Sequence, residues 1–183
     1  RQGMSRAAIV GAGLIGRAWA ISFARSGFDV ALFDQDGTAA DRALGFIDSV
    51  LDDLHANDLL NGNAPDAVRK RITPVTSLKT ALDGTVHVQE NAPEQLDIKK
   101  ALYAELDSLA APDTVLSSST SALLPSHIFN GLPGARRCLV VHPINPPYLV
   151  PAVEVVPSPW TEPSVMERTA KLMRDIGQAP IFM

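Results

Sequence analysis

The sequence has 183 residues, which is the usual length of a single domain. Hydrophobic residues make up 46% of it and charged residues 20%, and this balance excludes a disordered chain, a collagen and a coiled coil. The net charge is -4 without a cluster of lysine and arginine, and Cys138 is the one cysteine, so we expect no nucleic-acid partner, no disulfide framework and no bound metal.

The N-terminal residues Arg1–Gly3, in front of Met4, look like the remnant of an expression tag, and we assign one domain to residues 4–183. No apolar run approaches the ~20 residues that cross a bilayer, so we expect no membrane partner. Gly11, Gly13 and Gly16 interrupt the first apolar stretch, which argues against a secretion signal. We therefore expect a cytoplasmic protein.

Short apolar runs typical of buried strands alternate with segments of helical spacing. Strands are predicted at 7–10, 30–33, 72–75, 86–89, 114–116, 138–141 and 152–156. Helices are predicted at 14–25, 38–60, 64–71, 77–82, 93–109 and 163–176. Pro93 is expected to open its helix, whose apolar face would be Ile98, Leu102, Leu106 and Leu109. This alternation predicts an α/β fold, with a mostly parallel sheet and helices on both of its faces.

Gly11, Gly13 and Gly16 have the spacing G-x-G-x-x-G between a predicted strand and a predicted helix. In that context Gly11 permits a tight turn, Gly13 lets the backbone approach a pyrophosphate, and Gly16 lets the helix pack closely on the strand. Leu14 and Ile15 lie in the same turn, at a helix N-terminus whose free N–H groups attract phosphate. The segment predicts a dinucleotide-binding turn, and the alternative is a tight turn that binds nothing.

Asp34 follows the second predicted strand, where a carboxylate accepts hydrogen bonds from a ribose 2′-hydroxyl and repels a 2′-phosphate. Gln35 and Asp36 come next, with no arginine nearby, so the sequence favours NAD over NADP as the cofactor. FAD shares the glycine fingerprint and stays a minor alternative. A second alternative is that Asp34 caps the helix that follows it.

His142 ends a predicted strand at the carboxyl edge of the sheet, where open α/β sheets bind ligands. Glu154 lies twelve residues later inside an apolar strand, where a charge needs a partner, and His142 is the candidate. A carboxylate on one ring nitrogen makes the other nitrogen a better base. The alternative is that Glu154 faces solvent from an edge strand and that His142 is a capped core residue. The other histidines, His55, His87 and His127, are interpreted as structural or solvated.

The hydroxyl cluster Ser117–Ser121 follows another predicted strand, at the same expected edge. Hydroxyl groups both donate and accept hydrogen bonds, which suits them to hold a substrate hydroxyl or carbonyl. The alternative is a polar turn that caps the following helix. No G-x-S-x-G motif is present, so a hydrolase serine is disfavoured.

Four segments together resemble the NAD-binding domain of the 3-hydroxyacyl-CoA dehydrogenase superfamily, across nearly all of 6–183: Gly11–Gly16, Gln89–Glu94, Ser117–Ser121 and His142–Pro147. Within it, the chain is most similar to the lambda-crystallin and L-gulonate 3-dehydrogenase branch. Acyl-CoA members typically carry two aromatic residues after the histidine, where this chain has Pro143 and Ile144. The resemblance implies a Rossmann-type fold and NAD as cofactor.

The resemblance also implies a role for each matching position. His142 matches the catalytic base that takes the hydroxyl proton, and Glu154 matches the carboxylate that orients it. Ser121 matches the serine that holds the substrate oxygen. Three further positions match residues at the cofactor, namely Glu94, Lys99 and Asn145.

The implied activity is NAD-dependent oxidation of the secondary alcohol in a small 3-hydroxy acid such as L-gulonate. A 3-hydroxyacyl-CoA or carnitine dehydrogenase is the alternative enzyme. A rival of another class is a non-catalytic NADH sensor or a structural protein, which would need the glycines and Asp34 but not His142 with Glu154. The family has a second, helical domain that completes the pocket and carries much of the dimer interface. Because this chain ends within a strand-like run at 179–183, we interpret it as the front part of a longer, homodimeric protein whose helical domain is absent here.

Overall fold

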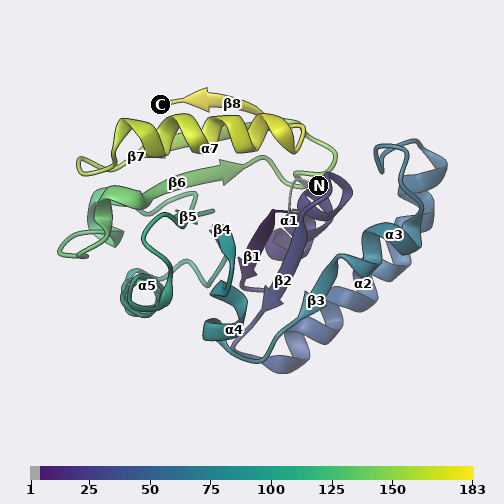
Figure 1. Ribbon diagram of the computed structural model, residues 1–183, viewed down its shortest axis with the longest axis horizontal. Coiled ribbons are helices and arrows are strands. Elements are labelled where there is room, and N and C mark those ends of the chain that lie inside the picture. The colour runs from purple at the N-terminus through teal and green to yellow at the C-terminus, as the bar shows by residue number, and fades with distance from the viewer. Residues whose placement is uncertain (1–4) are drawn as a thin grey trace.

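The computed structural model describes residues 5–183, so the expected tag remnant and Met4 lie outside the described residues. The strands form one eight-stranded sheet with the order β3-β2-β1-β4-β5-β6-β7-β8. The strands are β1 (Arg6–Val10), β2 (Asp29–Phe33), β3 (Ile72–Pro74), β4 (Thr85–Glu90), β5 (Val115–Ser118), β6 (Cys138–Pro143), β7 (Ala152–Pro157) and β8 (Ala179–Phe182). The helices are α1 (Leu14–Arg25), α2 (Gly37–Ala56), α3 (Pro65–Lys70), α4 (Leu78–Leu82), α5 (Leu96–Leu109), α6 (Pro125–Ile128) and α7 (Pro163–Asp175), with a 3₁₀ turn at Ala135–Arg137. Figure 1 shows the strands side by side, with β8 and α7 at one end of the sheet and β3 at the other.

The sheet is parallel from β3 through β6, and β7 then runs antiparallel to β6. Parallel neighbours need a crossover of ~12 residues or more, whereas a short connection joins antiparallel ones. The connection between β6 and β7 is the short segment 144–151, which reverses the chain direction. This reversal sets residues of β6 and β7 directly opposite each other.

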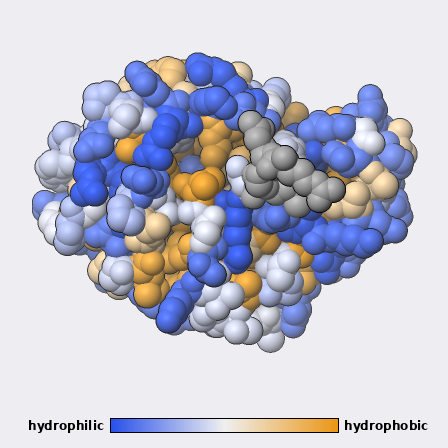
Figure 2. Space-filling view, viewed as in Figure 1, coloured by the Kyte–Doolittle hydropathy of each residue, from blue (hydrophilic) through white to orange (hydrophobic). Residues whose placement is uncertain are grey.

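Apolar residues of the central strands alternate between two cores, one on each face of the sheet. In β1, Ala7 and Ile9 pack with side chains of α1, α2 and α7. Ala8 and Val10 pack on the other face with α4, α5 and α6. Because successive side chains of a strand point to opposite faces, helices cover both faces, as predicted. Figure 2 shows a mostly hydrophilic rim around this view of the molecule, with apolar side chains gathered toward its middle.

Two predicted helix boundaries are wrong. Helix α2 ends at Ala56 rather than at residue 60, and Asp58 and Asn61 then take φ values of +56° and +54°, a conformation that stops a helix. Helix α5 begins at Leu96 rather than at Pro93, because the backbone of segment 91–94 bonds side chains of the functional site instead.

The predicted apolar face of α5 is also wrong in part. Leu106 is buried, but Ile98 and Leu109 are each 41% exposed. The buried positions are Lys99, Tyr103 and Leu106. Lys99 turns inward because it pairs with a buried carboxylate, and the helix face turns with it.

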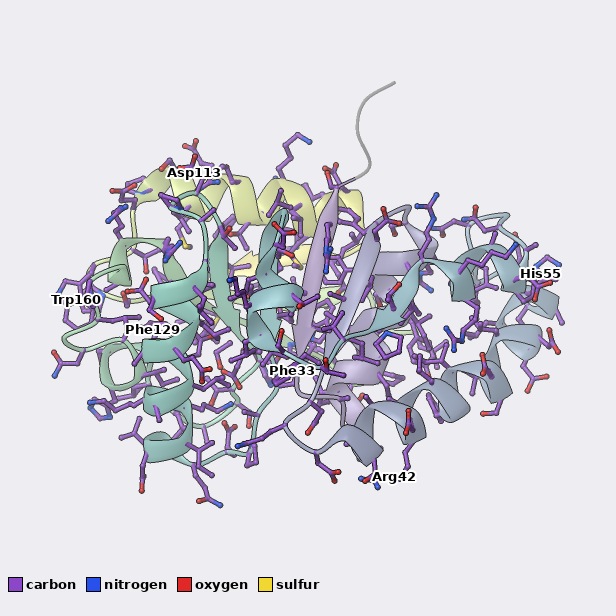
Figure 3. All side chains as sticks on the ribbon, turned by 60° about the horizontal axis from the view of Figure 1, so that its bottom comes forward. Phe33, Arg42, His55, Asp113, Phe129 and Trp160 are labelled. Carbon is purple, nitrogen blue, oxygen red and sulfur yellow. The ribbon has the colours of Figure 1, made fainter. Side chains whose placement is uncertain are left out.

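The carboxyl ends of the parallel strands lie together at one edge of the sheet. Phe33 ends β2 at this edge, whereas Asp113 lies at the opposite edge, before β5 begins (Figure 3). His55, near the end of α2, and His127, in α6, are exposed, as expected for solvated histidines. The candidate site residues after β1, β2, β4, β5 and β6 therefore meet at one edge.

Candidate active site

The turn between β1 and α1 has no room for side chains at two of its glycines. Gly11 has a φ of +96°, and a Cβ there would lie 2.6 Å from the carbonyl oxygen of Asn91. A Cβ on Gly16 would lie 1.8 Å from the carbonyl oxygen of Gly11. Gly13 differs, because a Cβ there would meet no atom within 4 Å. The turn is therefore packed tightly on its inner side and open at Gly13.

The open side of this turn fits a dinucleotide phosphate. Gly13 is the N-cap of α1 and provides no side chain to bond the first N–H groups of the helix. Leu14, the first residue of the helix, is 65% exposed. Free N–H groups and the positive end of the helix dipole are the features that bind phosphate.

Asp34 ties the end of β2 to the glycine turn. Its carboxylate accepts hydrogen bonds from the N–H of Ala12 and from the N–H of Asp36, both at 2.8 Å. Asp36, not Asp34, caps α2, since it accepts a hydrogen bond from the N–H of Thr38. The alternative that Asp34 is a helix cap is wrong, and its half-buried carboxylate lies beside the turn.

His142 and Glu154 are paired across β6 and β7. The two residues are direct register partners in the antiparallel ladder, and Nδ1 of His142 lies 3.2 Å from Oε2 of Glu154. A carboxylate accepts hydrogen bonds, so Nδ1 carries the proton in the neutral ring and Nε2 is left as the basic nitrogen. Their side chains are 27% and 39% exposed, so the pair is reachable from solvent. Strand β7 lies inside the sheet, with β8 beyond it, so the edge-strand alternative is wrong.

Glu94 and Ser121 meet at the ends of β4 and β5. The Glu94 carboxylate accepts hydrogen bonds from Oγ1 of Thr120 at 2.6 Å, from the N–H of Ser121 at 2.9 Å and from Oγ of Ser121 at 3.1 Å. Partial burial raises the pKa of Glu94, but these hydrogen bonds and the Lys99 charge outweigh it and hold the pKa below its ordinary value. Because the Ser121 N–H bonds the same carboxylate oxygen as its hydroxyl, the hydroxyl can rotate toward a ligand without leaving that oxygen unpaired.

Lys99 is fixed by buried partners. Its Nζ lies 2.6 Å from Oε2 of Glu90 and 3.0 Å from the carbonyl oxygen of Ala92. Glu90 also accepts hydrogen bonds from the N–H of Ala92 at 2.7 Å and from Oγ of Ser118 at 2.6 Å. Lys99 and Glu90 therefore hold segment 91–94 at the sheet edge. Sequence reasoning missed Glu90, because the predicted strand ended at Gln89 and the burial of Glu90 depends on its ion pair with Lys99 from helix α5.

A second polar cluster lies beneath the same edge. Oγ of Ser119 accepts hydrogen bonds from Nε1 of Trp19 at 3.1 Å and from Nε2 of Gln89 at 2.8 Å, and donates to Oδ1 of Asn91 at 2.7 Å. This arrangement holds Asn91 against the glycine turn. Gln89 and Asn91 belong to a segment that carried the family resemblance, but no role was predicted for them.

His87 ends this cluster inside the protein. The Gln89 amide nitrogen donates to Ser119 and to the carbonyl oxygen of Val141, so its oxygen faces His87 and accepts from the ring Nε2 at 2.9 Å. Burial lowers the pKa of His87 to about 4, which makes it a neutral, structural histidine.

A cavity of about 470 Å³ brings together six of the twelve predicted site residues. It is lined by Ile15, Glu94, Lys99, Ser121, His142 and Asn145, among others. Glu154 contacts His142, and the glycine turn with Asp34 lies at the ends of β1 and β2. Within residues 5–183 no cluster of histidine, cysteine and acidic side chains could hold a metal, and no helix has the length and apolar character to cross a membrane.

Comparisons with known proteins agree with this geometry. Residues 6–183 match the family described as 3-hydroxyacyl-CoA dehydrogenase, NAD binding domain. Lambda-crystallin of Oryctolagus cuniculus is 45% identical over 174 residues, which are 94% of this chain and 54% of that protein. The L-carnitine dehydrogenase/betainyl-CoA thioesterase of Ruegeria pomeroyi is 36% identical over 98% of this chain and 36% of its own length.

Among solved structures, 3-hydroxybutyryl-CoA dehydrogenase from Escherichia coli superposes with a TM-score of 0.92 at 29% identity, covering 98% of this chain and 38% of that one. The chain thus spans about half the length of the lambda-crystallins that it matches. The glycine turn, the acid after β2 and the match over residues 6–183 lead to one conclusion. This chain belongs to the NAD-binding domain family of the 3-hydroxyacyl-CoA dehydrogenases, which are NAD-dependent enzymes with a Rossmann-type fold.

Proposed function

We propose that the protein oxidises the secondary alcohol of a small 3-hydroxy acid, with NAD as the oxidant and His142 as the general base. The observation that carries the proposal is the His142–Glu154 pair, with 3.2 Å between Nδ1 and Oε2, at the edge of the cavity. A non-catalytic dinucleotide binder needs the glycine turn but has no use for a histidine oriented by a carboxylate.

In this proposal each residue of the site has one task. His142 receives the hydroxyl proton on Nε2, and Glu154 stabilises the imidazolium that forms. Ser121 holds the substrate oxygen with a hydroxyl that rotates away from Glu94. Bound NAD supplies the acceptor for the hydride. When His142 takes up the hydroxyl proton, the carbon that bears this hydroxyl loses its hydride more readily and becomes the carbonyl carbon.

We assign cofactor binding to the turn and to the neighbouring strand ends. Gly11, Gly13, Leu14, Ile15 and Gly16 would hold the pyrophosphate at the start of α1. Asp34 would accept hydrogen bonds from the adenosine ribose, since a carboxylate that takes two N–H groups keeps free lone pairs. The positions that would lie near the nicotinamide are Glu94, Lys99 and Asn145, which line the cavity. Because Lys99 is already held by Glu90, it would act there by holding the loop as well as by its charge.

The proposed substrate is L-gulonate or a hydroxy acid like it. The similarity to lambda-crystallins supports this class, and the loop after His142 has Pro143 and Ile144 where acyl-CoA members have aromatic residues. L-Carnitine is a second candidate, supported by the 36% identity to the bifunctional carnitine dehydrogenase of Ruegeria pomeroyi. A 3-hydroxyacyl-CoA is the third, supported by the likeness to the E. coli enzyme.

We further propose that residues 4–183 are the cofactor domain of a longer cytoplasmic homodimer. A helical domain that follows it would complete the substrate pocket and form the dimer interface. The proposal is supported by the share of the relatives that the chain matches, 54% of the rabbit protein.

The experiment that tests the activity uses the full-length gene product with NAD. L-Gulonate, L-carnitine and 3-hydroxybutyryl-CoA are offered side by side, and NADH formation is followed by absorbance. Turnover of one of them supports the enzyme and selects the substrate class. Tight NADH binding without turnover of any would favour the sensor or structural protein instead.

A further inference from the structure

The segment 144–151, between β6 and β7, has few backbone hydrogen bonds of its own. Backbone bonds to neighbouring strands hold only its two ends, from the N–H of Ile144 to the carbonyl oxygen of Ala152 and from the N–H of Ala179 to the carbonyl oxygen of Pro151. Prolines at 146, 147 and 151, with Pro143 before it, provide no N–H group. Its internal hydrogen bonds are those from the N–H groups of Leu149 and Val150 to the carbonyl oxygen of Pro146. The segment nevertheless starts right after the proposed base, and it carries Asn145 into the cavity lining.

Two side chains from distant elements bond the carbonyl groups of this segment. Nε2 of Gln178, just before β8, donates to the carbonyl oxygen of Pro147 at 2.7 Å. Nη1 of Arg25, the last residue of α1, donates to the carbonyl oxygen of Tyr148 at 2.8 Å. The two acceptors are consecutive residues, and Pro147 is two positions from Asn145. The segment is thus clamped from two sides.

The same two anchors each leave a polar atom without a partner. Within residues 5–183, Nε of Arg25 and Oε1 of Gln178 are buried and make no hydrogen bond. Gln178 is only 4% exposed, and burial lowers the pKa of Arg25. An unpaired buried polar atom lowers the free energy of unfolding. Stability alone therefore does not account for Arg25 and Gln178 at these positions. The donor groups of Arg25 and Gln178, by contrast, bond carbonyl oxygens of segment 144–151, in which the prolines provide no N–H group to do so.

We propose that Arg25 and Gln178 are positioning residues, which hold segment 144–151 so that Asn145 and His142 keep their places in the cavity. Neither residue is among those that line the cavity, so both would act through the backbone of Pro147 and Tyr148. The expected effect of these residues on turnover rests on the proposed dehydrogenase activity, whereas their expected effect on the mobility of segment 144–151 does not.

The test uses Gln178→Leu and Arg25→Met in the full-length protein, with Arg25→Lys as the conservative variant. Hydrogen exchange of the Leu149 and Val150 amides is expected to speed up about tenfold in Gln178→Leu and Arg25→Met, because a lost anchor opens the segment locally. Arg25→Lys keeps a positively charged hydrogen-bond donor and is expected to restore most of the protection. If Gln178→Leu does not fold, the exchange rates of Arg25→Met and Arg25→Lys still compare the segment without and with an anchor at residue 25.

Asn63→Ala is the matched control. Nδ2 of Asn63 donates to the carbonyl oxygen of Arg25 at 2.9 Å, at the same end of α1, but it makes no contact with segment 144–151 in the described hydrogen bonds. It is expected to leave the exchange of Leu149 and Val150 unchanged. Equal exchange in the wild type and both anchor variants, or equally faster exchange in Asn63→Ala, would overturn the inference.

Kinetics separate this inference from the proposed activity. If the enzyme turns over, kcat of the anchor variants is expected to fall about tenfold while KM for NAD changes less than about twofold, because a misplaced reacting group costs rate more than binding. A fall in kcat matched by an equal rise in KM would assign the anchors a general structural role. Absence of turnover in the wild type would remove the proposed activity and leave the exchange result standing.

Discussion

His142 and Glu154 lie directly opposite each other across an antiparallel pair of strands, with 3.2 Å between Nδ1 and Oε2. In a parallel sheet two residues this close in sequence could not be neighbours, because a crossover separates successive strands. The short segment 144–151 reverses the chain and brings the carboxylate to the ring. The reversal at the end of the parallel sheet therefore creates the candidate base.

Replacing His142 by alanine is expected to lower kcat about 10²–10⁴-fold, the usual contribution of a general base. NADH binding should stay within about twofold, because the glycine turn is untouched. Steady-state kinetics and NADH fluorescence titration measure the two effects. His127→Ala, at an exposed histidine, is the control. Normal turnover of His142→Ala would remove the proposed base.

Glu154→Gln and Glu154→Ala separate charge from orientation. The glutamine oxygen can still accept from Nδ1, so we expect about a tenfold loss of kcat from the missing charge and about a hundredfold loss in Glu154→Ala. Glu162→Gln is the control, since Glu162 is exposed and lies 3.8 Å from Arg136. Equal kcat in the wild type and both Glu154 variants would contradict the orienting role.

Gly16→Ala is expected to destabilise the protein by ~3 kcal/mol, because its Cβ would lie 1.8 Å from the carbonyl oxygen of Gly11. The control is Gly45→Ala, at an exposed position of α2 where a Cβ meets nothing within 4 Å. That change is expected to stabilise by ~0.5–1 kcal/mol, since alanine favours a helix. Urea unfolding measures both. Similar values for the two variants would contradict the close packing of the turn.

Asp34→Ala is expected to weaken NADH binding about tenfold and to narrow the preference for NADH over NADPH. The variant loses both the proposed ribose acceptor and the hydrogen bond from the N–H of Ala12. Asp36→Ala, which removes the α2 cap, is expected to lower the stability of the protein without changing the preference for NADH over NADPH. Fluorescence titration with NADH and with NADPH measures the two dissociation constants in each variant. An unchanged NADH-to-NADPH ratio in Asp34→Ala would contradict the assignment.

His87 predicts a loss of stability in acid. Its pKa in the folded protein is lowered from 6.5 to about 4 by burial, so the unfolded chain binds the proton more readily. The free energy of unfolding is therefore unaffected by this group above pH 6.5 and decreases as the pH falls toward 4, where the loss amounts to ~3 kcal/mol.

Urea unfolding between pH 4 and 7.5 measures this slope in the wild type and in His87→Leu. The variant is expected to be less stable at neutral pH, because Gln89 and Ser117 lose a partner, but to have a shallower slope over this range. His55→Ala, at an exposed histidine, should keep the wild-type slope. Parallel slopes in the wild type and His87→Leu would show that another group titrates.

The strands, the order of elements and the glycine turn could be predicted because they depend on local patterns. Short apolar runs are typical of buried strands, and the spacing of Gly11, Gly13 and Gly16 reflects backbone sterics that act within a few residues. Helix α5 was predicted less well, because Lys99 is buried by an ion pair with Glu90. Apolar periodicity within the helix carries no information about such a pair, since the partner Glu90 lies in strand β4.

The sequence by itself determined that a nucleotide turn, an acid after β2 and a histidine followed by a carboxylate are present, in an order that fits one fold. The tertiary structure decided which of these groups touch. It placed Glu154 on Nδ1 of His142, turned Ser121 toward Glu94 and clamped segment 144–151 with Arg25 and Gln178. The reason is physical: strand and helix formation follow from neighbours in the chain, whereas a hydrogen bond between side chains depends on sheet register and on helices packed from distant parts of the sequence.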